Sequence, residues 1–297
     1  MNNASHSEES IAAVEATLDG EAGHAQKRRT RDLSLMNYPA TYLLLGINVV
    51  VYVVMFRFGP VPELFRQHVW TQILTASFDI DTLVRFGATN TGMILAGQWW
   101  RLVTGTFVHI TLLHILLNMW CLWNLGLFGE PLLGRRGLVV VYLLTGTAGM
   151  LLSLIWTPTG SDLTTAGASG AVFGIAGILI VLLSNRGLNV PWNELVSLRR
   201  QVIFFAVANL AIGMAPGVLG FATPGQLGAL HLDPSALPHI DNSAHIGGFV
   251  TGLALGMPLF PRMTSGKLRY RARQRLTFAV AALVLCLIAF AVARAKV

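Results

Sequence analysis

The chain has 297 residues, of which 54% are hydrophobic and 12% charged, and its mean hydropathy is +0.60. Soluble domains carry about 25% charged residues, so this composition excludes an ordinary soluble protein and predicts an integral membrane protein. The net charge of +7 at pH 7 does not indicate a nucleic-acid partner, because the basic residues gather in alternate loops between apolar segments.

The first 40 residues are predicted to form a cytoplasmic tail. They lack the apolar core of a signal peptide, and they contain acidic residues that a mitochondrial presequence avoids. These acidic residues are Glu8, Glu9, Glu15, Asp19 and Glu21.

Seven apolar stretches follow the tail, each near the length of about 17–25 residues that crosses a bilayer as a helix. The fourth and sixth are short and begin with a polar residue, which predicts that their first turns face water inside the protein. The stretches are 41–58, 110–128, 138–156, 169–184, 202–218, 245–260 and 278–293.

Lys and Arg are concentrated in loops that fall on one side of the membrane if all seven stretches span it. An excess of these residues marks cytoplasmic loops. The pattern therefore predicts a multi-pass protein with a cytoplasmic N-terminus, and we expect it in a bacterial inner membrane. The groups are Lys27, Arg28, Arg29 and Arg31; Arg135 and Arg136; Arg186, Arg199 and Arg200; and Arg262, Lys267, Arg269, Arg271, Arg273 and Arg275.

The predicted fold is an all-α membrane protein, a polytopic helical bundle. We expect a tail over 1–40, a six-span core over 41–261, and a basic linker with a seventh membrane helix over 262–297. A long segment, 59–109, separates the first two spans, and its tryptophans predict a position at the membrane interface. The free thiols of Cys121 and Cys286 fall within predicted spans and are expected to behave as small apolar side chains.

Ser169 begins the fourth apolar stretch, in the sequence Gly167-Ala168-Ser169-Gly170. A hydroxyl at a helix N-terminus lies beside backbone N–H groups that stabilise developing negative charge. This arrangement suits a catalytic nucleophile, although a serine in a Gly-rich turn is also a common helix cap.

His245 begins the sixth stretch, and Gly248, Gly252 and Gly256 follow it at intervals of four. Small residues at this spacing allow another membrane helix to pack closely. Gly170 and Gly174 offer the matching surface on the fourth stretch. The two glycine rows predict that Ser169 and His245 meet, so that the imidazole takes the hydroxyl proton and creates a nucleophile.

The second stretch supplies His114 and Asn118, which share one helical face because they are four residues apart. Acyl transfer requires hydrogen-bond donors directed at the oxyanion of the tetrahedral intermediate, and these side chains with the Ser169 N–H suit that role. Hydrogen bonding between helices is the alternative. His109 is expected either to support the long segment or to line a path for water.

Two further residues lie near the predicted pair. Phe173 follows Ser169 by one helical turn and is expected to stack on the His245 imidazole, unless it faces lipid or the core. Asp241 precedes His245 by four residues but falls in a loop, where acids at helix starts are common. We therefore expect a Ser–His pair without a third member.

The sequence lacks the residues that other kinds of intramembrane protease require. No His-Glu-x-x-His sequence is present for a zinc protease, and no Asp falls within a predicted span for an aspartic protease. No Gly-rich phosphate loop follows a strand. The sequence predicts no metal and no cofactor.

Five short motifs occur in the order found in one known family. They are Trp100-Arg101, His114-Ile115-Leu116-Leu117-Asn118, Gly126-x-x-x-Glu130-x-x-x-Gly134, Gly167-Ala168-Ser169-Gly170 and Ala244-His245-Ile246-Gly247-Gly248. Over about 41–261, the chain resembles the rhomboid intramembrane serine proteases.

The resemblance implies that Ser169 is the nucleophile and His245 the general base. It also assigns His114, Asn118 and the Ser169 N–H to the oxyanion hole, and it makes Arg101 and Glu130 structural ties. Family members often have Tyr where Phe173 stands. The expected activity is cleavage of transmembrane or juxtamembrane segments of single-span membrane proteins.

Two other functional classes compete with this interpretation. A non-proteolytic relative that binds membrane clients generally lacks the Ser or the His, and both are present here. A transporter usually shows intramembrane charges or broken helices in paired halves, and the sequence shows neither.

Overall fold

The computed structural model describes residues 35–59, 74, 76–188, 191–219 and 241–296. Most of the tail predicted over 1–40 lies outside these residues. The chain divides into two compact units, Met1–Tyr38 and Pro39–Val297. The described part of the first unit contains a turn at residues 35–37, and everything below concerns the second unit.

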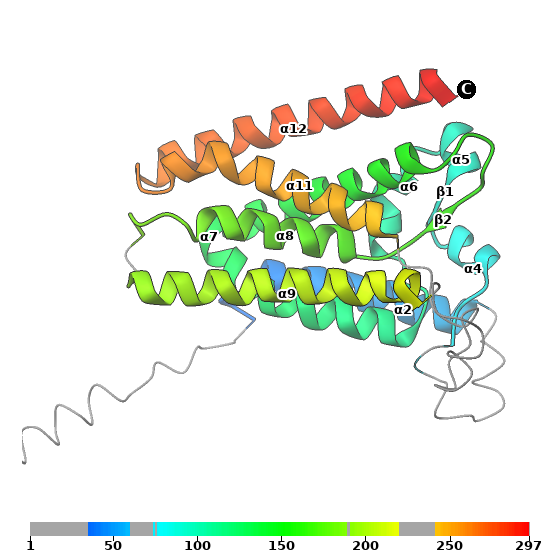
Figure 1. Ribbon diagram of the computed structural model, residues 1–297, viewed down its shortest axis with the longest axis horizontal. Helices are drawn as coiled ribbons and strands as arrows, with labels where there is room; N and C mark the ends of the chain where they lie inside the picture. The colour runs from blue at the N-terminus through cyan, green and yellow to red at the C-terminus, as the bar shows by residue number, and fades with distance from the viewer. Residues whose placement is uncertain (1–34, 60–73, 75, 189–190, 220–240, 297) are drawn as a thin grey trace, which may run out of the picture. The chain divides into compact units, whose positions relative to one another are not determined.

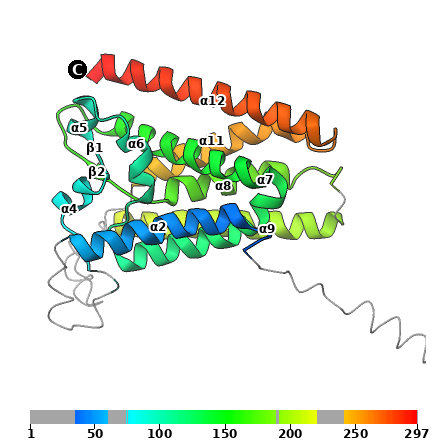
Figure 2. The ribbon, with the colours of Figure 1, turned by 180° about the vertical axis from the view of Figure 1, so that it is seen from behind.

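Helices form nearly all of the described part of the second unit (Figures 1 and 2), as predicted for an all-α fold. The long helices are α2 (Pro39–Phe58), α7 (Leu112–Trp156), α8 (Ser169–Leu182), α9 (Trp192–Leu219), α11 (Asn242–Leu259) and α12 (Lys267–Lys296). Short elements are α4 (Ile80–Arg85), α5 (Thr91–Leu95), α6 (Arg101–Thr104), η2 (Gly105–Phe107) and η4 (Phe260–Arg262). Strand β1 (Thr89–Asn90) pairs antiparallel with β2 (Thr164–Thr165).

Helix α7 contains two of the predicted spans. Its 45 residues would extend about 68 Å as one straight rod, roughly twice the thickness of the hydrocarbon core. Gly134 breaks the rod with a φ of +75°, a conformation that glycine adopts readily. A Cβ atom on Gly129 would lie 3.2 Å from Leu138 Cδ1, so the two arms of α7 are in contact beside the break.

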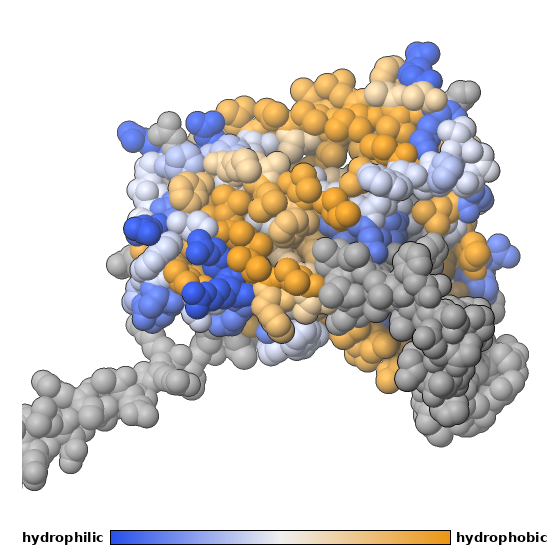
Figure 3. Space-filling model, viewed as in Figure 1, coloured by the Kyte–Doolittle hydropathy of each residue, from blue (hydrophilic) through white to orange (hydrophobic). Residues whose placement is uncertain are grey.

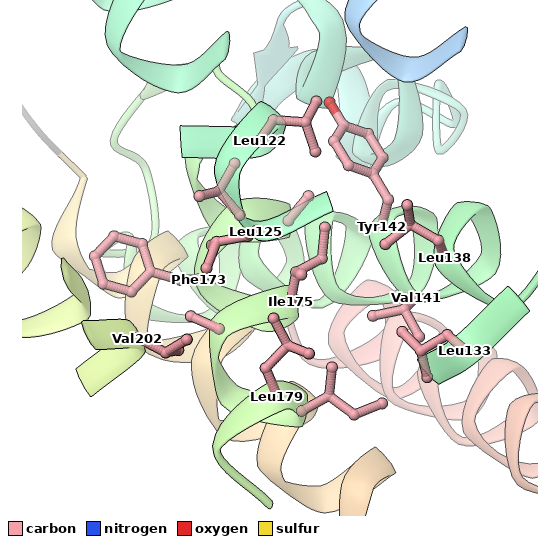
Figure 4. Packing of buried hydrophobic residues seen from close by; sticks show 14 of the residues in the cluster. Leu122, Leu125, Leu133, Leu138, Val141, Tyr142, Phe173, Ile175, Leu179 and Val202 are labelled. Atoms are coloured by element: carbon pink, nitrogen blue, oxygen red, sulfur yellow. The ribbon is translucent and has the colours of Figure 1, made fainter. Parts of the chain in front are cut away.

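Helix α8 is enclosed by protein. Ten consecutive residues after Ser169 are buried, from Gly170 to Leu179. Figure 4 shows Phe173, Ile175 and Leu179 among side chains of α7 and α9. The 14 residues of α8 extend about 21 Å, which is less than the roughly 30 Å of a bilayer core.

Glycines bring α8 and α11 together, as the two rows predicted. A Cβ atom on Gly248 would overlap the Gly170 carbonyl oxygen, and one on Gly252 would overlap the Gly174 carbonyl oxygen. Gly256 continues the row against a valine side chain of α8. Only residues without a side chain permit this backbone approach, so the pairing of α8 with α11 depends on these positions.

Helix α12 is longer than its predicted span. It begins at Lys267, within the stretch expected to be a linker, because Lys, Arg and Gln are good helix formers. Apolar side chains such as Leu276, Leu283 and Leu287 are exposed along it, and Figure 3 shows the resulting hydrophobic surface. By length and composition, α2, α7 and α12 can each cross a membrane. The chain is an integral membrane protein.

Glu130, a structural tie according to the resemblance, connects α7 to the start of α2. Its buried carboxylate accepts hydrogen bonds from the Ala40 and Thr41 backbone N–H groups, at 3.0 and 2.8 Å, and from the Thr41 hydroxyl at 2.7 Å. It therefore satisfies first-turn donors of α2 that have no partner within that helix.

Arg101 organises the segment predicted to lie at the membrane interface. Its Nη1 donates to the Val84 and Ala88 carbonyl oxygens at 2.6 and 2.9 Å, and its Nε donates to Gln98 Oε1 at 2.8 Å. The guanidinium also lies 4.5 Å from the centre of the Trp100 ring. The described part of this segment is thus a folded structure of short helices.

Candidate active site

A cavity of about 510 Å³ lies where α7, α8 and α11 begin. His114 from α7, Ser169 from α8 and His245 from α11 all line it. The structure therefore brings together three polar residues that the sequence singled out on separate helices. Leu113, Leu117 and Ile246 supply apolar walls.

Ser169 is half-buried at the first position of α8. The backbone reaches it through Gly167, whose φ of +135° favours glycine. A Cβ atom on Gly167 would lie 2.6 Å from His114 Cε1, 2.8 Å from its Nε2 and 3.8 Å from Ser169 Oγ. Gly167 thus lets the His114 ring approach the serine.

His245 is only 7% exposed and packs face to face with Phe173. The two ring centroids are 4.6 Å apart and the ring planes differ by 20°. Phe173 comes from α8 and His245 from α11, so the stacking fixes the imidazole plane relative to the helix that carries Ser169. Within the described residues, His245 Nδ1 is buried without a hydrogen-bond partner.

His109 supports the backbone just before Ser169. Its Nδ1 lies 3.3 Å from the Phe107 carbonyl oxygen, and its Nε2 lies 3.4 Å from the Ala168 backbone nitrogen. A neutral imidazole protonated on Nδ1 satisfies both contacts, since it donates at one nitrogen and accepts at the other. The His109 ring also packs edge-on against His114, with centroids 5.1 Å apart.

Asn118 is the predicted oxyanion-hole residue that the structure does not place on the cavity wall, and the predicted supporting residues His109, Gly167 and Phe173 do not line it either. It is buried one turn further along α7, where its Nδ2 donates to the His114 carbonyl oxygen at 2.9 Å. Its amide therefore braces the turn of the helix that presents His114.

Asp241 caps α11, as its position before the helix predicts, and it also lines the cavity, which no pattern in the sequence predicts. One carboxylate oxygen accepts the backbone N–H groups of Ser243 and Ala244, at 3.1 and 3.2 Å, and the Ser243 hydroxyl. The other oxygen accepts the Thr165 hydroxyl at 3.0 Å and the Ser153 hydroxyl.

These contacts explain the ionisation of Asp241. Burial alone would raise the pKa of this carboxyl group, but the hydrogen bonds from Ser153, Ser243, Ala244 and Thr165 outweigh burial and hold the pKa below its ordinary value of 3.8. The position of an acid before a helix signals a cap, whereas partners 76 and 88 residues away give no local signal in the sequence.

In the part of the chain that the structure describes, no three His, Cys, Asp or Glu side chains converge to hold a metal ion. The polar side chains at this cavity match acyl transfer through a serine and an imidazole.

Comparison with known proteins decides the family. The model of the rhomboid domain matches residues 96–262. The chain belongs to the rhomboid family. The family predicted from the five motifs is thereby confirmed.

Similar rhomboid proteins occur in bacteria and eukaryotes. Rhomboid protease GluP of Bacillus subtilis is 30% identical over 223 residues, which cover 73% of this chain and 35% of GluP. RHOMBOID-like protein 1 of Arabidopsis thaliana is 31% identical over 196 residues, covering 65% of this chain and 43% of the relative. Rhomboid-like protease 2 of Toxoplasma gondii is 30% identical over 217 residues, covering 72% of this chain and 67% of the relative. The chain spans less than half the length of the first two relatives.

Proposed function

We propose that this rhomboid protein is an intramembrane serine endopeptidase that cleaves transmembrane or juxtamembrane segments of single-span membrane proteins. The observation that carries the proposal is the shared cavity of Ser169 and His245, two residues 76 positions apart, inside an apolar helical bundle. Partners are single-span substrates within the lipid bilayer.

In the proposed reaction, His245 takes the proton of the Ser169 hydroxyl, and Ser169 Oγ attacks the carbonyl carbon of the scissile bond. The imidazolium then gives this proton to the leaving amine, and water hydrolyses the acyl-enzyme. The backbone N–H of Ser169 and the His114 side chain stabilise the oxyanion, and Asn118 completes this group by holding the turn of α7 that presents His114. His109, Gly167 and Phe173 support these groups.

A dyad accounts for the site better than a triad. The oxygens of the Asp241 carboxylate are occupied by donors other than His245. The imidazole is oriented instead by stacking on Phe173.

The distribution of basic residues supports a cytoplasmic N-terminus and a site that opens toward the outside, in a bacterial inner membrane. Gln274, beside the basic start of α12, donates to the Leu133 carbonyl oxygen at the break in α7. Asn185, after α8, donates to the Phe260 carbonyl oxygen after α11. The described basic residues beside the break in α7, after α8 and at the start of α12 therefore lie at the end of the bundle away from the starts of α8 and α11, as the positive-inside rule predicts.

The substrate must unwind locally before it can react. Backbone groups in lipid are already hydrogen-bonded within a helix. We expect small residues at the cleavage site and helix-weakening residues beyond it, because both help the carbonyl reach Ser169.

The test is cleavage of a model single-span substrate by purified protein in liposomes. Ser169→Ala should abolish cleavage and leave thermal unfolding unchanged, since the substitution removes one oxygen at a half-buried position. Cleavage at the wild-type rate by purified Ser169→Ala protein would refute the proposed function.

A further inference from the structure

We infer that Asp241 is a positioning residue of the proposed reaction: its carboxylate fastens the segment that leads into Ser169 to the helix that carries His245, and its charge stabilises the imidazolium. The inference rests on the proposed function. It assigns a role to a residue that neither attacks nor transfers a proton.

The mechanical part of this role follows from the hydrogen bonds of the carboxylate. Thr165 belongs to β2 and precedes Ser169 by four residues, and Asp241 precedes His245 by four. The 3.0 Å hydrogen bond between Thr165 and Asp241 therefore joins the two catalytic segments directly. Ser153 adds the second arm of α7 to the same carboxylate oxygen.

The other carboxylate oxygen fixes the start of α11. It accepts the N–H groups of Ser243 and Ala244, which have no partner within the helix at this end. A helix held at its first turn presents His245, one turn further on, in a constant direction. One side chain thus holds both the capped helix and the strand before the nucleophile.

The electrostatic part follows from the position of the charge. Asp241 and His245 line the same cavity, and Asp241 is the charged group whose field acts on this imidazole. A carboxylate near a forming cation lowers the energy of the charge-separated state, and more so where water is scarce. The interaction acts through space, because His245 Nδ1 has no hydrogen-bond partner among the described residues.

Two other titratable side chains lie on elements that neighbour this pair. His114 of α7 interacts electrostatically with His245. Lys296 of α12 donates to the Thr157 carbonyl oxygen, one turn beyond Ser153.

Two substitutions separate the mechanical part from the charge. Asp241→Asn keeps one side-chain oxygen to cap Ser243 and Ala244, replaces the oxygen that accepts the Thr165 and Ser153 hydroxyls by an NH2 group to which these hydroxyls can act as acceptors, and removes the negative charge. Asp241→Ala removes both. The matched control is Asp79→Asn, because Asp79 caps α4 by accepting the Thr82 N–H at 2.7 Å and does not line the cavity.

The experiment measures kcat and KM for the single-span substrate in liposomes, with thermal unfolding, for the full chain and each variant. Asp241→Asn should lower kcat about tenfold or more with KM near wild type and only a small fall in Tm, as expected when a nearby charge is lost. Asp241→Ala should lower kcat further and also lower Tm. Asp79→Asn should leave kcat unchanged.

A wild-type kcat for folded Asp241→Asn would overturn the inference. If Asp241→Asn does not fold, Thr165→Val removes one hydroxyl donor and keeps the charge. A reduced kcat with unchanged Tm in Thr165→Val supports the link between the two segments, and a wild-type kcat overturns it. Failure of the proposed function gives a different result from failure of this inference. If the proposed function is wrong, wild-type protein does not cleave the substrate or Ser169→Ala still cleaves it.

Discussion

Helices α8 and α12 are both apolar but have opposite surroundings. Helix α8 is buried over almost its whole length and begins with Ser169. No residue in the most apolar window of α12 is buried, although Phe278 and Ala281 pack against the edge of the core, and Gln274 is the one buried residue of this helix. Hydropathy alone therefore does not determine which apolar helix is buried in the bundle. The glycines of α8 and α11 determine it, because they let these two helices pack closely.

The two helices should differ most in how much stability is lost when a side chain is changed at their surfaces. Gly252→Val places a side chain against the Gly174 carbonyl oxygen and forces α8 away from α11. Overpacking of this kind costs about 3 kcal/mol or more, so we expect loss of folded protein, measured by size-exclusion chromatography and thermal unfolding. Leu283→Val on the exposed face of α12 should change stability by about 0.5 kcal/mol or less. Equal stability of the two variants would contradict the comparison.

The next effect concerns the contact between α8 and the imidazole. Phe173→Leu keeps an apolar side chain but removes the ring that stacks on His245 at 4.6 Å. Because aromatic pairs contribute about 0.5–1.5 kcal/mol beyond burial, kcat should fall by roughly three- to tenfold with a small change in Tm. Phe173→Tyr retains the ring and serves as the control. A wild-type kcat for Phe173→Leu would show that stacking does not orient the base.

Substitution of the anchor of α12 should affect stability without affecting chemistry. Gln274→Ala removes a buried hydrogen bond of 3.0 Å to the Leu133 carbonyl oxygen, which should lower the free energy of unfolding by about 1 kcal/mol. The kcat of the folded protein should not change, because α12 contributes no residue to the cavity wall. A tenfold fall in the kcat of Gln274→Ala would contradict this prediction, because it would show that the position of α12 affects the active site.

The smallest expected effect is a pH dependence of stability that arises from Asp241 at the start of α11. Because the pKa of Asp241 lies below its ordinary value of 3.8 in the folded chain, the carboxylate stabilises the fold above pH 3.8. This stabilisation is lost as the pH falls through the lowered pKa. The Tm difference between wild type and Asp241→Asn should therefore shrink below pH 3.8. A difference that stays constant would contradict the assignment.

The sequence was most informative where a short-range pattern determines the structure. Gly248 and Gly252 match Gly170 and Gly174 in spacing, and that periodicity alone predicts the contact between α8 and α11. The break in α7 was likewise visible, because two apolar stretches are separated by Gly134, Arg135 and Arg136.

Other features depend on contacts between distant residues and leave no local pattern. The partners of Asp241 are set by the folding of β2 and α7 around it. The spacing of His114 and Asn118 does not show whether the Asn118 amide points to the oxyanion, to another helix or to its own helix; in the structure it donates to the His114 carbonyl oxygen. The hydrogen bond that holds Gln274 of α12 at the break in α7 joins residues 141 positions apart.

The most direct test of the central claim is the reaction of Ser169 with a fluorophosphonate, followed by intact-mass and peptide mass spectrometry. If the packing of α8 against α11 brings imidazole and hydroxyl together, wild-type protein forms one adduct on Ser169, and folded His245→Ala protein reacts at least about a hundredfold more slowly. Labelling of Ser169 at equal rates in both proteins would contradict the account.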